Sequence, residues 1–187
     1  MFRDLYASEI ECRVAQIKTD KDNNPTGVTV LLYKDARCDQ NILDETVGPF
    51  NWQRHHSRDN ANCVVSIWDD KKSCWVGKED TGTESNTEKE KGLASDSFKR
   101  ACFNWGIGRE LYTAPFIWIP AAGCTELKQN NNGKWQCFDH FAVERIRTEN
   151  KKIVGLSIVN LKTGQRVFVW TDPVWEAMEK AKKAGVQ

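Results

Sequence analysis

Residues 88–112 read EKEKGLASDSFKRACFNWGIGRELY, and the interpretation of the remaining chain starts from this stretch. At about 100° per residue, its apolar residues form a stripe along one side of a helix. The stripe consists of Leu93, Ala94, Ser97, Phe98, Ala101, Cys102 and Trp105. Asp96, Lys99, Arg100 and Phe103 fall on the opposite side. The stretch therefore predicts a helix that buries one face and exposes a Lys–Arg pair beside an aromatic ring.

Both ends of this helix have sequence signals. Ser85 with Glu88, or Thr87 with Glu90, has the spacing of an N-terminal capping box. Gly106 follows the last residue of the stripe, where a left-handed backbone conformation commonly ends a helix. We therefore expect the helix to start shortly after residue 85 and to end near Gly106.

The polar face of the helix has two interpretations. Asp96 can pair with Lys99 three residues later and with Arg100 four residues later, as on any solvated helix face. Such exposed pairs contribute only tenths of a kcal/mol, roughly 0.2–0.5 each. The alternative is a binding surface for a negatively charged partner.

Composition limits the classes of protein to consider. The 187 residues carry a formal net charge of +1, so a nucleic-acid partner would have to be held by a local basic patch. We expect a single domain over residues 1–187, with a core over about 10–120 and a β-rich extension over 121–187. No apolar run reaches about 18 residues, and the first residues are unlike a signal peptide. A cytoplasmic protein without a membrane partner is expected.

The cysteines and histidines do not predict a metal centre. Seven cysteines are scattered without a C-x-x-C pair, and the three histidines complete no zinc spacing with them. Such cysteines are typical of reduced thiols that act as small hydrophobic side chains in the cytosol. We therefore expect neither a structural metal nor a cofactor.

Hairpins and short helices follow one another in the first half of the chain. Residues 12–17 and 28–33 are β-prone and flank the turn formers DKDNNPTG. Asp35 can cap a helix over residues 36–47, which Gly48 and Pro49 end. Arg37 lies in the first turn of this helix, an electrostatically poor place for a cation, which suggests a role other than local stability.

A second hairpin and a β-rich tail complete the pattern. Residues 63–68 and 73–78 flank the turn Asp69–Lys72. The later segments comprise an extended apolar run over 112–120, strands over 141–147, 153–160 and 166–170, and a basic helix over 174–184. The expected fold class is α+β, with antiparallel hairpins, helices packed on the sheet, and a C-terminal β-hairpin module followed by a helix.

Enzyme signatures are scarce. The sequence contains neither the P-loop pattern G-x-x-x-x-G-K-[ST] nor the dinucleotide-binding pattern G-x-G-x-x-G. No nucleophile–base pair can be nominated either. A carboxylate cluster is present at Glu79, Asp80, Glu84, Glu88 and Glu90. A metal-dependent nuclease needs paired carboxylates with a nearby lysine on a strand, whereas the D-x-K triplets here fall on a turn. A protein without a covalent catalytic site is the favoured interpretation, and a nuclease is a less favoured alternative.

Four segments, in this order, resemble the phage branch of the Rad-fifty-two-type single-strand annealing proteins. They are IECRV at 10–14, YKDARCDQNILDETVGPFNW at 33–52, CVVSIWDDKKSCWVGKEDTG at 63–82 and GLASDSFKRACFNWGIGRELY at 92–112. The resemblance implies a β-β-β-α core, a ring or arc of identical subunits, and single-stranded DNA in a basic groove. It implies pairing of complementary strands without ATP, as in a phage recombinase acting in recombination and repair. A passive single-strand-binding or mediator module is the alternative.

The resemblance also implies which side chains contact DNA. Lys99, Arg100 and Arg37 match groove positions of the family, and Arg109 and Lys91 match other basic positions. Arg54, within the ionisable run over 53–58, is a further candidate. The implied partners are single-stranded DNA with its complement, further copies of this chain in a ring or filament, and a single-strand-binding protein or an exonuclease. The implied location is the cytoplasm of a host bacterium.

Annealing requires that DNA is held by its phosphates while its bases remain free to pair. Lys99 and Arg100 meet this requirement, and Arg37 becomes a plausible third contact. Phe103 could stack a base or be buried against a neighbouring subunit, and we favour the second. We expect the hairpin from Trp68 to Trp75 to lie near the groove.

Overall fold

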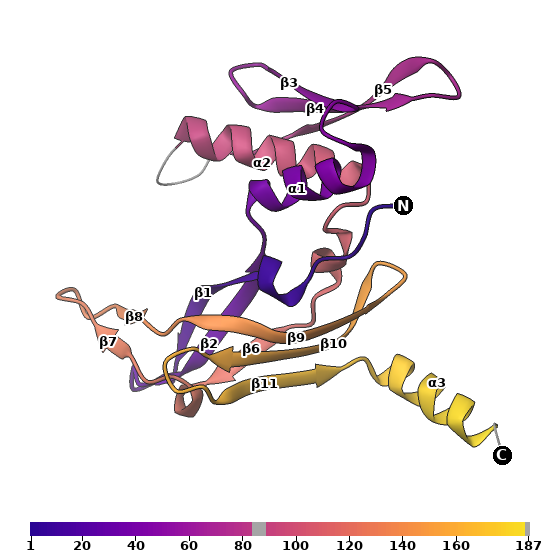
Figure 1. The fold of residues 1–187 in the computed structure, drawn as a ribbon. Helices are drawn as coiled ribbons and strands as arrows, with labels where there is room; N and C mark the ends of the chain where they lie inside the picture. The colour runs from indigo at the N-terminus through magenta and orange to yellow at the C-terminus, as the bar shows by residue number, and fades with distance from the viewer. Residues whose placement is uncertain (84–88, 186–187) are drawn as a thin grey trace. The chain divides into compact units, whose positions relative to one another are not determined.

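The computed structural model describes residues 1–83 and 89–185. The fold is α+β, with mostly antiparallel sheets and three α-helices in the described part of the chain. The chain forms two compact units (Figure 1). Unit 1 comprises Met1–Leu5 with Lys34–Arg109, and unit 2 comprises Tyr6–Tyr33 with Glu110–Gln187.

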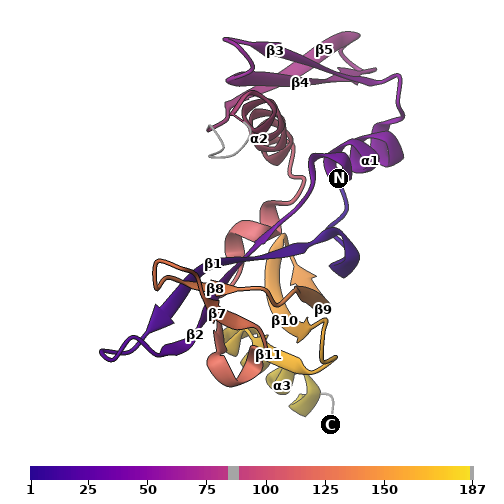
Figure 2. The same ribbon diagram turned by 90° about the vertical axis from the view of Figure 1, so that its left-hand side faces the viewer.

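Unit 1 is a three-stranded antiparallel sheet covered on one face by a helix. Its elements are α1 (Ala36–Val47), β3 (Trp52–Ser57), β4 (Asn62–Asp69), β5 (Cys74–Thr81) and α2 (Lys89–Asn104). β4 lies between β3 and β5, and α2 packs against β4 and β5 (Figure 2). Successive side chains of a strand point to opposite faces, so the buried Cys63 and Val65 of β4 face the helix together.

The predicted helix over residues 36–47 is confirmed as α1. The side chain of Asp35 accepts a hydrogen bond from the backbone N–H of Arg37, which satisfies one of the free donors at the helix start. The buried residues of α1 are Cys38, Asp39, Ile42 and Leu43. Asp39 tolerates burial because it forms an ion pair with the buried side chain of Lys34.

Unit 2 is built on a six-stranded sheet with the order β11-β10-β9-β1-β2-β6. The strands are β1 (Glu11–Thr19), β2 (Pro25–Tyr33), β6 (Ile117–Pro120), β9 (Phe141–Glu149), β10 (Lys152–Asn160) and β11 (Arg166–Thr171). The predicted hairpin of β1 and β2 is confirmed by their antiparallel register. A small hairpin of β7 (Leu127–Gln129) and β8 (Trp135–Cys137) and the helix α3 (Pro173–Ala184) complete the unit.

Strand β3 and the division of the chain differ from the sequence-based expectation. The ionisable run over residues 53–58 forms most of β3, although its side chains are not β-prone, because its backbone pairs with the apolar strand β4. The sequence predicts a boundary near residue 120, but the compact units divide the chain at other positions. The reason is that β1 pairs with β9 and β2 with β6, which joins residues 6–33 to the C-terminal half.

Among the described residues, no helix has both the length and the apolar character needed to cross a membrane.

Candidate nucleic-acid interface

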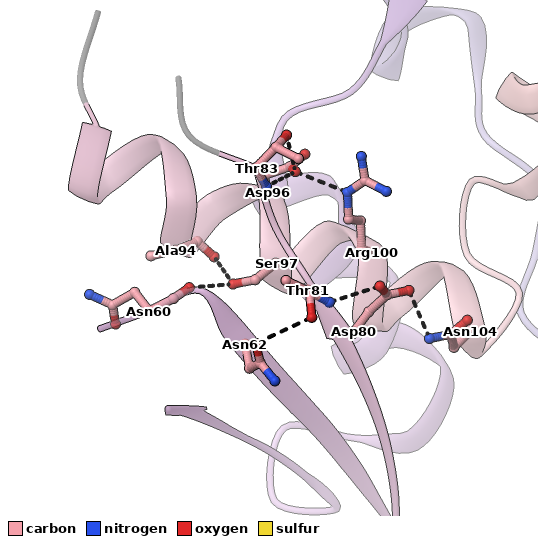
Figure 3. A network of polar contacts seen from close by, with 10 residues as sticks. All are labelled: Asn60, Asn62, Asp80, Thr81, Thr83, Ala94, Asp96, Ser97, Arg100 and Asn104. Carbon is pink, nitrogen blue, oxygen red and sulfur yellow. Dashed lines mark hydrogen bonds and ion pairs between the residues drawn. The ribbon is translucent and has the colours of Figure 1, made fainter. Parts of the chain in front are cut away.

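Helix α2 is fixed to the sheet of unit 1 by a buried apolar face and by hydrogen bonds. Phe98, Ala101 and Cys102 have no exposed surface, as the stripe predicted. Ser97 is also fully buried, and its hydroxyl donates to the backbone oxygens of Asn60 at 2.9 Å and Ala94 at 3.2 Å (Figure 3). Because these bonds satisfy the buried hydroxyl, a polar residue fits within the apolar stripe.

The C-terminal end of α2 is held by a turn of the type that sequence analysis predicted. Gly106 has a φ of +96°, its N–H donates to the oxygen of Phe103, and the N–H of Ile107 donates to the oxygen of Cys102. This pair of bonds is the Schellman motif. It satisfies two carbonyl groups that would otherwise lack partners at the helix end.

Two cations complete this helix end. The guanidinium of Arg109 donates from Nε to the oxygen of Phe103 and from Nη2 to the oxygen of Asn104, both at 2.9 Å. The ammonium of Lys78 donates to the same oxygen of Asn104 at 2.8 Å and lies 4.4 Å from the ring centre of Trp105. Positive charge at a helix C-terminus is stabilising. Arg109 thus has a structural role here, and its predicted contact with DNA stays a prediction.

The polar face of α2 contains a three-member network. Asp96 accepts from Nε of Arg100 at 2.9 Å and from the backbone N–H of Thr83 at 2.9 Å (Figure 3). The Thr83 hydroxyl donates to the same oxygen at 3.2 Å. Burial alone would raise the pKa of Asp96, but these hydrogen bonds bring it below its ordinary value. The pairing of Asp96 with Arg100 is therefore present, whereas Asp96 makes no ion pair with Lys99 among the described residues.

Arg37 also has a carboxylate neighbour. Its guanidinium donates to Oδ2 of Asp35 from Nε at 3.2 Å and from Nη2 at 2.7 Å, while the side chain remains 83% exposed. The unfavourable position of a cation in the first turn is thus offset by the capping residue itself. The hydrogen bonds from Arg37 lower the pKa of Asp35, and the positive charge of Lys99 lowers it further. Lys99 of α2 therefore lies within electrostatic reach of the first turn of α1.

The ammonium of Lys99 makes no hydrogen bond or ion pair within residues 1–83 and 89–185. Its charge also lowers the pKa of Asp39, although burial dominates and raises that pKa to about 6. Helices α1 and α2 are in contact, and Lys99 lies within electrostatic reach of Asp35, the carboxylate that pairs with Arg37.

The remaining predicted contacts lie elsewhere or beyond the described residues. Arg54 of β3 lies with its guanidinium carbon 4.9 Å from the ring centre of Phe98, so it contributes to packing between sheet and helix. The side chain of Lys91 is outside the described residues, as are both predicted capping boxes at the start of α2.

The hairpin of β4 and β5, which is expected near the groove, carries the aromatic side chains of Trp68 and Trp75. Trp68 and Trp75 are direct partners in the register and contact each other edge to face at 5.5 Å between ring centres. Trp75 is 42% exposed. A hollow of about 450 Å³ at the hairpin turn is lined by Ile67, Trp68, Asp69, Asp70, Lys71, Lys72, Val76 and Trp105. The sequence signal for Trp68 and Trp75 was their symmetric placement about the turn.

The carboxylate cluster does not assemble in the described part of the chain. Glu79 and Asp80 are consecutive in β5 and so point to opposite faces. Glu79 accepts from the Asn62 amide at 2.6 Å, and Asp80 accepts from the Asn104 amide at 3.1 Å. The side chains of Glu84, Glu88 and Glu90 are outside the described residues.

Comparisons with protein families, with curated proteins and with solved structures find no match for this chain. The resemblance to annealing proteins therefore rests on the four sequence segments. The function has to be argued from them and from the geometry of α1 and α2.

Proposed function

We propose that the protein binds single-stranded DNA along adjoining faces of α1 and α2 and anneals complementary strands without ATP. The observation that carries the proposal is that Lys99 of α2, next to Arg100 in the sequence, lies within electrostatic reach of Asp35, which pairs with Arg37 on the contacting helix α1. Arg37, Lys99 and Arg100 are the positions that match the family's groove. The proposal includes β3, β4, β5 and α2 as the annealing core of a Rad-fifty-two-like protein.

The local charge is suited to a surface that binds phosphate groups with moderate affinity. Taken by themselves, the three cations Arg37, Lys99 and Arg100 and the two carboxylates of Asp35 and Asp96 sum to a charge of +1. Solvent-exposed ion pairs contribute about 0–1 kcal/mol, so a phosphate can replace a carboxylate as the partner of either arginine. Lys99 is available without such an exchange. Binding of this kind is strong enough to collect strands and depends steeply on salt.

Contacts to phosphate carry no sequence information, which is what annealing of arbitrary strands requires. The aromatic side chains near the helix end can add affinity without base specificity. Phe103 has the guanidinium of Arg109 5.5 Å from its ring centre, so it can serve either a base or a neighbouring subunit. We favour burial of Phe103 against a neighbouring subunit.

We further propose that the protein works as a ring or a filament of identical subunits. Within the sheet of unit 1, β3 and β5 each pair with β4 on one side only. Unpaired strand edges can pair with a second copy. Light scattering at micromolar concentration should report a large oligomer, and a monomer both with and without DNA would contradict this part of the proposal.

An annealing assay with two complementary fluorescent oligonucleotides tests the function directly. The expected result is accelerated duplex formation in the absence of ATP. Binding without acceleration would instead support a passive single-strand-binding or mediator module, in which a single-strand-binding protein or an exonuclease is the working partner. Cleavage that requires magnesium would support the nuclease.

A further inference from the structure

Two cysteines far apart in the sequence lie together in unit 2. Cys124 directly follows the short 3-10 helix Ala121–Gly123, and Cys137 is the last residue of β8. Their sulfur atoms and a carboxylate oxygen of Asp139 all lie within 4.8 Å of one another. Neither cysteine is in a disulfide, and both are half-buried. Sequence spacing gave no indication of this cluster.

A metal site is the first interpretation to examine. Asp139 accepts from the backbone N–H groups of Thr125 and Glu126, from the Thr125 hydroxyl at 2.6 Å and from the Asn160 amide at 2.7 Å. An ionised carboxylate offers about four acceptor positions, so these donors occupy its capacity. A metal would have to displace one of them. Only the two thiols would then remain as ready ligands, fewer than the four of a structural zinc site.

We propose that Cys124 and Cys137 form an oxidisable dithiol that closes to an intramolecular disulfide on reaction with a small-molecule disulfide such as oxidised glutathione. The thiolate of Cys137 attacks one sulfur of the glutathione disulfide, which forms a mixed disulfide and releases a glutathione thiolate. The thiol of Cys124 then loses its proton to that thiolate and attacks the sulfur of Cys137. The second glutathione leaves as a thiolate and takes up the proton that was released when the Cys137 thiolate formed, so the dithiol has lost two electrons and two protons to the reagent.

Cys137 is assigned as the first nucleophile because it is accessible and because its pKa is the lower of the two. The Cys124 thiol donates to the backbone oxygen of Pro120 at 3.8 Å, and the Cys137 thiol donates to Oδ2 of Asp139 at 3.7 Å. The interaction between the two sulfurs lowers the pKa of Cys137 and raises that of Cys124. Cys137 also lines an open hollow of about 640 Å³ between β1 and the β7–β8 hairpin. The thiolate is the reactive form of cysteine, so the more acidic and accessible thiol reacts first.

Tryptic mapping tests the proposal on the intact chain. Cleavage after lysine and arginine places Cys124 alone in peptide 110–128 and Cys137 alone in peptide 135–145, and it releases residues 129–134 between them. After equilibration with oxidised and reduced glutathione and capping of free thiols, we expect the two peptides to be joined by a reducible link. Exposed Cys74, alone in peptide 73–78, serves as the internal reference for accessible thiols.

Single variants test the order of the two steps. Cys124→Ser should stop at the mixed disulfide, with one glutathione on peptide 135–145. Cys137→Ser should leave peptide 110–128 unmodified over the same time. Separate peptides in the parent, under conditions that modify Cys74, would refute the dithiol. So would one zinc ion per chain that the reduced parent retains through dialysis and Cys124→Ser does not, because the cluster would then be a metal site.

Discussion

Replacing Lys99 and Arg100 together with alanine should separate DNA binding from folding. Arg100 is 40% exposed and makes an ion pair with Asp96 four residues earlier, a type of contact worth about 0.3–0.5 kcal/mol. The ammonium of Lys99 makes no hydrogen bond or ion pair among the described residues. Alanine is the best helix former, so the free energy of unfolding should change by less than about 1 kcal/mol.

The effect on binding follows from the salt dependence of phosphate contacts. For single strands, log K falls by about 0.7 for each contact per tenfold rise in salt. A parent with about four contacts should lose affinity roughly 50-fold between about 50 and about 200 mM salt. The variant, with about two, should lose only about 7-fold. Fluorescence anisotropy with a labelled oligonucleotide at several salt concentrations measures both slopes.

A matched control removes the same charge elsewhere. Lys180 and Lys182 of α3 also lie on an exposed helix surface and pair with Glu176 and Glu179. Alanine at both positions should leave the salt slope at its parent value. If the Lys99/Arg100 variant keeps the parent slope, or if the control loses as much, the face of α1 and α2 is not the groove. If the Lys99/Arg100 variant unfolds, the two residues are structural.

Three further substitutions have expected outcomes. Asp96→Ala should bind DNA somewhat more tightly, because it removes a carboxylate beside Lys99 and Arg100, yet it should cost about 0.5–1.5 kcal/mol in urea unfolding, because Thr83 and Arg100 lose this acceptor; unchanged stability would show that this network contributes little. Lys34→Met should cost about 3–5 kcal/mol at pH 8, because it leaves the buried Asp39 without its cation. Burial raises the pKa of Asp39 to about 6, so the contribution of this group to the free energy of unfolding declines as pH rises from about 4 to about 6. The cost of Lys34→Met should therefore be smaller at pH 5 than at pH 8. Although burial opposes the shift, hydrogen bonds hold the pKa of Asp139 well below its ordinary value, so its contribution is present above about pH 4 and is lost on acidification. Asp139→Asn should therefore be less stable at neutral pH and should lose less stability than the parent in acid, as measured by thermal unfolding; parallel pH profiles would contradict this.

Structural elements could be predicted from the sequence where the residues that determine them lie close together in the chain. The cap at Asp35, the Gly106 helix end and the turns of the hairpins all depend on residues within a few positions of one another. The strand over 52–57 could not be predicted from its own residues, because it exists through pairing with β4. The same holds for the Cys124–Cys137 pair, which depends on the turn between β7 and β8.

The candidate site shows the same limit. The helix wheel correctly placed Ser97, Phe98, Ala101 and Cys102 on the buried face of α2, whereas Leu93, Ala94 and Trp105 of the same stripe are only partly buried. It could not show that Arg109 contacts the last carbonyls of that helix, because those contacts require the chain to reverse after Gly106. Sequence spacing also gave no indication that Asp35 accepts from the guanidinium of Arg37, because spacing does not specify how side chains are oriented around a helix cap.

The chain passes from unit 1 to unit 2, returns to unit 1 and ends in unit 2, and this order has a consequence during synthesis on the ribosome. The β1–β2 hairpin leaves the ribosome early, but Gly27 finds its sheet partner at Pro120 and Glu11 finds its partner at Ala142. At roughly 5–20 residues per second, the hairpin waits about 5 to 25 seconds for these partners. Unit 1 is continuous from Lys34 to Arg109 apart from its first five residues, so it can close during that interval. During this interval both outer edges of the β1–β2 hairpin lack their sheet partners, so we expect it to be the segment of the nascent chain most open to non-native strand pairing.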